Sequence, residues 1–434
     1  MDETLLAGLV LFGLFFFLLA IGVPISVGIG VSSFVAALVI VPLDIAIFTA
    51  AQKIFQGINS FTLLAIIFFM LSGNIMNNGG IAIRLINLAK LLVGRLPGSL
   101  AHTNVVGNML FGSISGSAVA SAAAIGTVMA PLQKKEGYNP SFSAAVNIAS
   151  APTGLLIPPT TAFIVFSLVS GGTSISALFI AGYLPGILMG LSIMVAAYII
   201  AKKEKYPIAD KPTFKQGLKV VLDALPSLSL IVVVIGGIVS GIFTATEGSA
   251  IAVLYSAILA AFYKQLKLRD IPIMLKDTII MTGIVLFLVG TSSIMSWVMA
   301  YAGIPQAVTQ FLLTVSENPI IILLLMNIIL LIVGTFMDIT PAILIFTPIF
   351  LPVALQIGMD PVHFGVMLVF NLCIGITTPP VGSALFIGSS VADVSIESVI
   401  KPLLKLYIPL IITLLLVTYL PWISLALPKL LGIM

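Results

Sequence analysis

GSISGSAVAS at residues 112–121 and GTFMDITPAI at residues 334–343 are two copies of one pattern, and they decide the fold. Each copy lies among apolar runs and is rich in residue types that interrupt helices. Prolines and glycines downstream recur at a fixed spacing of 221 positions, at Pro131 and Pro352, Gly137 and Gly358, Pro140 and Pro361, and Pro158 and Pro379. Proline and glycine matches at one spacing are harder to obtain by chance than leucine and isoleucine matches. We therefore interpret the pattern as an internal repeat.

The repeat extends over nearly the whole chain. Further matches are Gly28 with Gly248, Gly80-Ile81 with Gly303-Ile304, and Tyr183-Leu184-Pro185 with Tyr407-Ile408-Pro409. The polar stretch 201–219, which is rich in lysine and contains Pro207 and Pro212, joins the two halves. Each half contains an odd number of full crossings, so the halves are expected to insert with inverted topology.

Composition indicates an all-α, polytopic membrane protein. The chain has 434 residues, of which 60% are hydrophobic and 8% charged, and apolar runs of about 20 residues recur along it. Asp2 and Glu3 stand where a signal peptide would be basic, so we expect no cleavable leader. The single cysteine, Cys373, excludes an internal disulfide. The net charge is +4, and the basic residues lie between the spans rather than in one patch, which argues against a nucleic-acid partner.

Hydropathy and the positions of proline and glycine predict the spans. In the first half we expect spans at 4–22, 25–42 and 61–78, a re-entrant hairpin at 102–133, a broken helix at 141–169 and a span at 175–200. In the second half we expect spans at 220–242, 246–264 and 277–300, a hairpin at 319–355, a broken helix at 361–391 and a span at 404–427.

The basic residues predict the orientation. With the stretch 201–219 in the cytoplasm, seventeen of the nineteen lysines and arginines lie on that side, and only Lys53 and Lys429 lie outside. The seventeen are Arg84, Lys90, Arg95, Lys134, Lys135, Lys202, Lys203, Lys205, Lys211, Lys215, Lys219, Lys264, Lys267, Arg269, Lys276, Lys401 and Lys405. Both termini are then periplasmic. The first hairpin opens from the cytoplasm and the second from the outside.

The interrupted segments are the candidate binding sites, because irregular backbone at membrane depth is tolerated where it lines a cavity. The first hairpin tip is expected at Ser113–Ser117, opposite a break at Ala151–Gly154 and Pro158-Pro159. Hydroxyl and carbonyl oxygens without an acidic cluster suit a monovalent cation such as sodium better than calcium. The half-helix N-termini suit an anionic substrate group. The alternative is a kink that neighbouring protein satisfies.

The second tip is expected at Thr335–Thr340, opposite a break at Gly375–Gly382. Asp338 lies between apolar runs, where a charge is costly unless it is paired, hydrated or bound to a cation. It could equally cap the second arm of the hairpin, before Thr340-Pro341. Glu247 is expected at a helix start that Thr244 or Thr246 caps. The candidate sodium and substrate residues are Ser115, Gly116, Ser117, Thr153, Gly154, Pro158, Thr335, Asp338, Thr340, Thr377, Thr378, Pro379 and Gly382.

These motifs, with GLLIPPTTAFI from Gly154 and GITTPPVGSALF from Gly375, give the chain a resemblance to a known family. It resembles the large membrane subunit, in the DctM and SiaM line, of tripartite ATP-independent periplasmic (TRAP) transporters. The resemblance implies the elevator fold of the ion-transporter superfamily in the bacterial inner membrane. It also implies sodium-coupled uptake of an organic acid, of the sialic acid or C4-dicarboxylate class, with sialic acid weakly favoured. Sodium ions would be the only coupling factor, with no other cofactor.

The resemblance also implies partners and a division into domains. The partners are a periplasmic substrate-binding protein and a small membrane subunit of about four spans. The expected division is a scaffold at 1–79 and 220–300, interfacial arms at 80–98 and 301–316, a linker at 201–219, and a transport domain at 99–200 and 317–434.

Two other functions share the architecture: a stand-alone sodium–carboxylate symporter and a sodium–proton antiporter. A channel would need more polar residues along its spans than this chain offers. An enzyme would need a nucleophile, an acid–base pair or a metal cluster, which the scarcity of His, Cys and intramembrane carboxylates disfavours.

Overall fold

The structure, a computed structural model, describes residues 3–209, 213–265 and 268–434, and the regular secondary structure in these ranges is helical. Within them, seven helices are long and apolar enough to cross a membrane, or up to nine spans if each bent pair counts as one. The predicted all-α, polytopic class is therefore confirmed. Pro212, Lys211 and Lys267 lie outside the described residues.

The first half runs from the amino-terminal span to the polar joint. Its helices are α1 (Glu3–Ala20), α2 (Ile25–Ile40), α3 (Leu43–Ile58), α4 (Leu63–Asn78), α5 (Ile81–Val93), α6 (Ser99–Ser115), α7 (Ala118–Lys135), α8 (Pro140–Ser150), α9 (Thr153–Leu156), α10 (Thr161–Val169) and α11 (Ile175–Glu204).

The second half repeats this order. Its helices are α12 (Phe214–Val239), α13 (Ala245–Phe262), η1 (Leu268–Asp270), α14 (Ile271–Tyr301), α15 (Ile304–Val315), α16 (Pro319–Phe336), α17 (Ile339–Gln356), α18 (Pro361–Gly375), α19 (Ser383–Val391), α20 (Ile396–Tyr419) and α21 (Pro421–Leu430).

Both predicted hairpins and both broken helices are present. Helices α6 and α7 form the first hairpin and α16 and α17 the second. The broken helices are α8–α10, bent by 50°, and α18–α19. The Pro158-Pro159 and Pro379-Pro380 bonds, at matching repeat positions, are both cis. Helices α5 and α15 each begin after a glycine in the left-handed conformation, Gly80 and Gly303, as the repeat alignment predicts.

Local sequence explains where several of these helices begin. Asn139, Asn318 and Asp360 each accept hydrogen bonds from backbone N–H groups of the following turn, and each precedes a proline at the first helical position. Thr244 and Glu247 form a reciprocal capping box at the start of α13, which confirms Thr244 as the cap.

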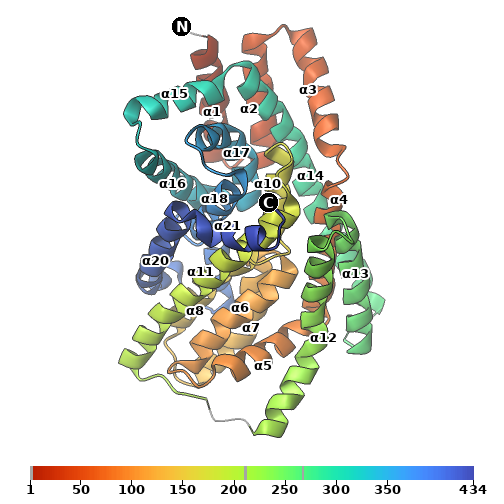
Figure 1. Cartoon of the computed structure of the whole chain (residues 1–434), viewed down its shortest axis with the longest axis vertical. Helices are drawn as coiled ribbons and strands as arrows, with labels where there is room; N and C mark the ends of the chain where they lie inside the picture. The colour runs from red at the N-terminus through yellow and green to blue at the C-terminus, as the bar shows by residue number, and fades with distance from the viewer. Residues whose placement is uncertain (1–2, 210–212, 266–267) are drawn as a thin grey trace.

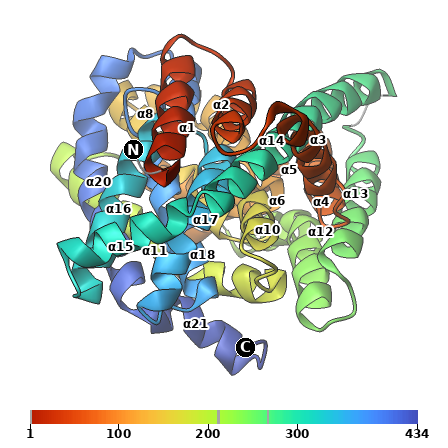
Figure 2. The same ribbon diagram turned by 90° about the horizontal axis from the view of Figure 1, so that it is seen from above.

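The helices pack into two groups. In one, α4 packs on α13, and α2 and α3 pack on α14; in the other, α6 packs on α7 and α9, α16 on α18, and α20 on α8. Figure 2 shows α3, α4, α12 and α13 gathered on one side and α8, α16 and α20 on the other. Helix α4 also contacts α6 of the second group, and α14 contacts α17. Figure 1 shows the arrangement of the helices from the side.

Two features of the structure differ from the predicted spans. Residues 43–58, which lie outside every predicted span, form α3, which meets α4 at a bend of 54°. The last predicted span, 404–427, is interrupted at Leu420, because Pro421 cannot continue the hydrogen-bond ladder of α20 and instead begins α21.

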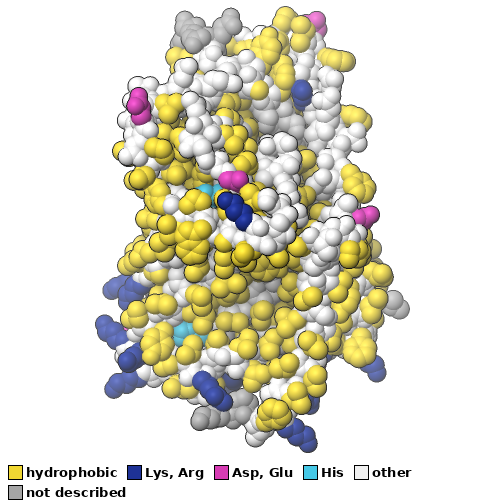
Figure 3. Space-filling model, in the orientation of Figure 1, with side chains coloured by type: hydrophobic (Ala, Val, Ile, Leu, Met, Phe, Trp, Pro, Cys, Tyr) yellow, Lys and Arg dark blue, Asp and Glu magenta, His cyan; other side chains and the backbone are white. Residues whose placement is uncertain are grey.

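Basic side chains gather at one end of the molecule. Figure 3 shows them at the end that carries the last turn of α11 and the start of α12, whereas few appear toward the amino terminus. Lys202 and Lys203 lie in that last turn of α11. This one-sided distribution is the pattern on which the predicted orientation rests.

Candidate functional site

The first hairpin tip is tighter than expected. Helix α6 continues through Ser113, Ile114 and Ser115, so only Gly116 and Ser117 lie outside helices, and the prediction of a five-residue tip is wrong. Gly116 has φ +61°, a conformation that glycine adopts without strain, and it reverses the chain within two residues. Ser117 caps α7 by accepting a hydrogen bond from the N–H of Ala120 at 3.3 Å.

The first tip meets the first break closely. An ideal Cβ on Gly154 would lie 2.1 Å from the Cα of Gly112, so the two backbones cross in direct contact. Gly116 lies beside the carbonyl oxygen of Pro159, which would stand 3.5 Å from a Cβ placed there. Small residues make such an approach possible between helices in a membrane.

Among the described residues, the Oγ of Ser115 is buried and has no hydrogen-bond partner. Thr153 is also buried, and its hydroxyl donates to the carbonyl of Ser150 at 2.6 Å, which leaves lone pairs on the Thr153 oxygen. Pro158 lies buried in the connection between α9 and α10. The first tip and the first break therefore carry a buried hydroxyl without a partner, at Ser115, and a second hydroxyl oxygen with free lone pairs, at Thr153.

The second tip repeats this crossing. Gly334 and Gly375 approach so closely that a Cβ on Gly375 would lie 2.5 Å from the Cα of Gly334. The carbonyl of Thr335 accepts hydrogen bonds from the N–H groups of Val381 and Gly382, at 3.2 and 3.4 Å. These bonds join the last turn of α16 to the segment after the break.

The second tip is also shorter than predicted. Only Met337 and Asp338 lie outside helices, whereas Thr335 belongs to α16 and Thr340 to the first turn of α17. Asp338 occupies the capping position of α17, but its side chain makes no capping bond to a described residue. Its Oδ1 instead accepts a hydrogen bond from Ser383, at 3.1 Å.

The rest of the second break is held by hydroxyl groups. Thr377 and Thr378 both donate to the carbonyl of Ile374, at 2.7 and 2.9 Å. The hydroxyl of Tyr407 donates to the carbonyl of Thr377 at 2.6 Å. Pro379 begins the cis pair, and Gly382, with φ +38°, directly precedes α19.

The two breaks meet each other. The Sγ of Cys373, in α18, lies 3.5 Å from the carbonyl oxygen of Pro152, just before α9. These two positions are 221 residues apart and are therefore equivalent in the repeat. Because equivalent positions of the two halves touch here, the pseudo-twofold axis that relates the halves passes close to this contact.

The two sites differ in exposure. Ser115, Gly116, Thr153 and Gly154 are buried, whereas Asp338 is exposed in the isolated chain. The first tip is covered by the other helix group: an ideal Cβ on Gly73 of α4 would lie 3.0 Å from the carbonyl oxygen of Ser115.

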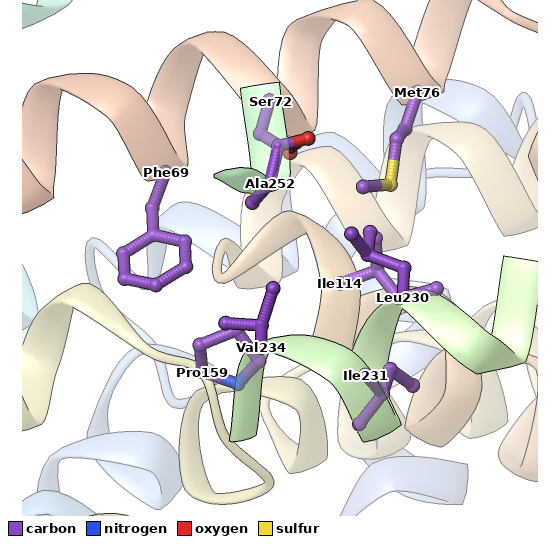
Figure 4. A pocket seen from close by; sticks show the side chains of 9 residues that line it. All are labelled: Phe69, Ser72, Met76, Ile114, Pro159, Leu230, Ile231, Val234 and Ala252. Carbon is purple, nitrogen blue, oxygen red and sulfur yellow. Dashed lines mark hydrogen bonds between the residues drawn. The ribbon is translucent and has the colours of Figure 1, made fainter. Parts of the chain in front are cut away.

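A narrow apolar cavity lies at this contact. Figure 4 shows Ile114 of the hairpin and Pro159 of the break facing side chains of α4, α12 and α13 across it. These are Phe69, Ser72, Met76, Leu230, Ile231, Val234 and Ala252. The surface between the two helix groups is thus mainly apolar at the first tip.

A larger cavity, of about 320 Å³, lies between the connection from α10 to α11 and the connection from α12 to α13. Its lining includes Ser167, Thr173, Ser174, Ser176 and Thr244, and none of the candidate residues. This cavity therefore lies apart from the two backbone crossings that mark the candidate sites.

Several residues that hold the sites were not among the residues predicted from the sequence. Ser383, the partner of Asp338, lies within the motif that begins at Gly375, but its role depends on the fold of the break. Asn108 donates to the hydroxyl of Ser150 at 2.8 Å and accepts from Ser121 at 2.7 Å, which braces the hairpin against α8. The i, i+4 spacing of Asn104 and Asn108 is the signal that could have indicated a polar face.

In the part of the chain that the structure describes, no three His, Cys, Asp or Glu residues cluster as ligands of a metal ion. The only carboxylate among the candidate residues is that of Asp338. Hydroxyl and carbonyl oxygens must therefore supply most of the ligands for any cation bound here.

The chain matches a known protein family over most of its length. Residues 12–423 match the family described as "Tripartite ATP-independent periplasmic transporter, DctM component". The chain is 57% identical to the uncharacterized protein YgiK of Salmonella typhimurium, over 97% of each protein. It is 41% identical to the sialic acid TRAP transporter large permease protein SiaM of Vibrio cholerae, over 88% of this chain and 89% of that protein.

The chain is also 36% identical to the C4-dicarboxylate TRAP transporter large permease protein DctM of Rhodobacter capsulatus, over 98% of this chain and the whole of that protein. Among solved structures, it is similar to the Alcanivorax borkumensis YdaH transporter, with a TM-score of 0.64, 14% identity and 99% of each chain covered. The structural similarity concerns the fold alone. The sequence matches show that the chain belongs to the DctM family, the large permease component of tripartite ATP-independent periplasmic transporters.

Proposed function

We propose that this permease takes up an organic acid across the bacterial inner membrane, coupled to sodium, with both candidate sites taking part. The observation that carries the proposal is the paired crossing of hairpin tip and helix break, at Gly112 with Gly154 and at Gly334 with Gly375. The tip and break segments carry backbone and hydroxyl oxygens, and the half-helices α10 and α19 begin just after the breaks. Oxygens suit a cation, and half-helix N-termini suit the anionic group of the substrate.

The proposed substrate is an acid of the sialic acid or C4-dicarboxylate class, with sialic acid favoured. The support is the names of two relatives, of which the sialic acid permease has the higher identity. Family membership implies a small membrane subunit and a periplasmic binding protein. We propose that both deliver substrate to this chain, that both of its termini face the periplasm, and that it does not transport efficiently alone.

We further propose an elevator motion, in which the hairpins and broken helices move as one body past α1–α4 and α12–α14. Support comes from the two packing groups and from the apolar surface between them at the first tip. Helices α5 and α15 join the groups. The arm α5 is fastened to α12 and α13, because the guanidinium of Arg84 contacts Asp223 at 3.2 Å and stacks over the ring of Tyr263 at 3.6 Å. Because α5 is held to the first group of helices, we propose that the hinge of the elevator motion on the α5 side lies after this helix, between Gly94 and Gly98.

The test is uptake into proteoliposomes that contain this chain with the small subunit and the binding protein encoded beside its gene. A sodium gradient should drive saturable uptake, and unlabelled sialic acid should compete better than succinate. Uptake by the chain alone, equal to that of the complete system, would favour a stand-alone symporter. Uptake that ignores the sodium gradient would exclude sodium coupling.

A second measurement tests the motion. In a Cys373→Ser background, cysteines at Phe69 and Ile114, which line the same cavity, should crosslink in this state. Sodium and substrate should change the yield. A yield that is constant under all conditions would show that the hairpin does not travel.

A further inference from the structure

A chain of buried amides runs through the first hairpin, and its direction is fixed at one end. The Nδ2 of Asn147 donates to the carbonyl of Ala122 at 2.8 Å. A carbonyl can only accept, so this bond determines which way the Asn147 amide is oriented. Its Oδ1 must therefore face Asn108, whose Nδ2 lies 3.1 Å from it. The two hydrogens of that Nδ2 serve the shorter contacts, to Ser150 and to Asn104.

The same reasoning continues along the chain. The Nδ2 of Asn108 also donates to the Oδ1 of Asn104, at 2.9 Å, while its Oδ1 accepts from Ser121. Asn104 consequently presents its oxygen to Asn108 and its Nδ2 away from it. Asn104 is 1% exposed, and its Nδ2 has no hydrogen-bond partner among the described residues. An unsatisfied donor at such depth is costly, so a missing acceptor is expected there.

A small cavity adjoins this amide. It offers about 10 Å³ to a water-sized sphere, which is about the space that one water molecule needs. Its polar lining consists of Asn104, Gln133, Ser143 and Asn147, and the remaining walls are Gly126, Ala130, Ala144, Gly388, Val391 and Ala392. Ser143 is 4% exposed, and its Oγ likewise has no partner in the described ranges.

We propose that this cavity binds one water molecule. The water accepts a hydrogen bond from Asn104 and bonds to the hydroxyl of Ser143. Two to four polar partners are what a buried water requires, and the side chain of Gln133, whose Nε2 already donates to Leu100, offers a further acceptor. A sodium ion does not fit here, because the free amide of Asn104 presents an N–H group.

The position of the site gives the water a structural role. Asn104 belongs to α6 and Ser143 to α8. Gly388 lies in α19 of the other repeat, and Ala392 directly follows that helix. The water therefore joins the first hairpin to its own broken helix, at the place where both pack on the second broken helix. This chain of bonds also reaches Ser150, the last residue of α8 before the first break.

The direct test is a density map of the full chain at a resolution that shows buried waters elsewhere in the protein. A peak within hydrogen-bonding distance of Asn104 Nδ2 and Ser143 Oγ is expected. An empty cavity in such a map would overturn the proposal. A crystal soaked in bromide tests whether the cavity binds an anion instead of water. An anomalous peak in the cavity would identify an anion site and would overturn the proposal of a water site.

Two variants test the role of the water. Ser143→Ala removes one partner but leaves room for the water, whereas Ser143→Val adds methyl groups that exclude it and leave Asn104 unsatisfied. The melting temperature of the detergent-purified chain should fall further for Ser143→Val than for Ser143→Ala, and hairpin amides should exchange faster with deuterium. Equal effects of the two variants would show that the water does not hold the hairpin. The map of the unaltered chain decides the site even if Ser143→Val fails to fold.

Discussion

Gly112 and Gly154 contact each other through their backbones, with no space for a Cβ on either residue. The contact joins the last turn of α6 to α9, and the repeat reproduces it between Gly334 and Gly375. A crossing that recurs in both halves indicates that the position of each tip is set by main-chain packing rather than by side chains.

Gly154→Ala should therefore destabilise the protein, by about 1–3 kcal/mol for overpacking of a filled site. Gly236→Ala is the matched control, because nothing lies within 4 Å of a Cβ at Gly236 in α12. Thermal unfolding in detergent measures both. Equal stability of the two variants would mean that the crossing can relax to admit a methyl group.

Gly73→Ala should disfavour the arrangement of this structure, in which the first hairpin tip packs against α4. Its Cβ would lie 3.0 Å from the backbone oxygen of Ser115, which is tighter than ordinary contact. The Phe69–Ile114 cysteine pair should crosslink less in this variant, while the fold persists. Gly283→Ala, at an open position of α14, serves as the control and should leave the yield unchanged.

Asp338→Asn should impair uptake and shift the sodium concentration at half-maximal rate by about tenfold or more, since a bond to a charged group is worth about 1.5–3 kcal/mol. The double variant Ser115→Ala with Ser117→Ala should act similarly at the first tip. Proteoliposome uptake at several sodium concentrations is the measurement. If neither variant alters the sodium dependence, these residues do not belong to the cation sites.

Arg84→Gln should loosen α5, because the ion pair with Asp223 and the stacking on Tyr263 are both lost. Arg84→Lys keeps the charge but not the planar stack, so an intermediate effect is expected. Hydrogen–deuterium exchange across residues 81–93 reports the change. Lys90→Gln, at an exposed position of the same helix, is the control. Equal exchange rates in Arg84→Gln and Lys90→Gln would show that Arg84 does not hold α5 in place.

The sequence predicted the order of spans, hairpins and breaks because proline and glycine mark chain interruptions directly. It placed Pro158 and Pro379 in the two breaks. It could not predict that only Gly116 and Ser117 form the first tip, because the small polar residues before them are compatible with either a helix or a turn. In the structure, the last turn of α6 packs on Gly154, 42 positions away from Gly112 along the chain, and the sequence does not show this contact.

The partner of Asp338 could not be predicted for a related reason. Ser383 is 45 residues away, and the hydrogen bond between them forms only because Val381 and Gly382 pair with Thr335. Helix α3 was missed because Asp44 and Lys53 lower its hydropathy, although the segment is amphipathic.

The contact between Pro152 and Cys373 has a consequence for the ancestry of the chain. If two unlinked copies of a half-length chain assembled in opposite orientations, a residue on the twofold axis would touch its own counterpart, and one substitution would alter both sides of the contact. In a single chain the two positions change separately. Proline occupies one position and cysteine the other. The joining of the two halves in one chain has therefore allowed the two breaks to diverge in sequence while the contact between them is kept.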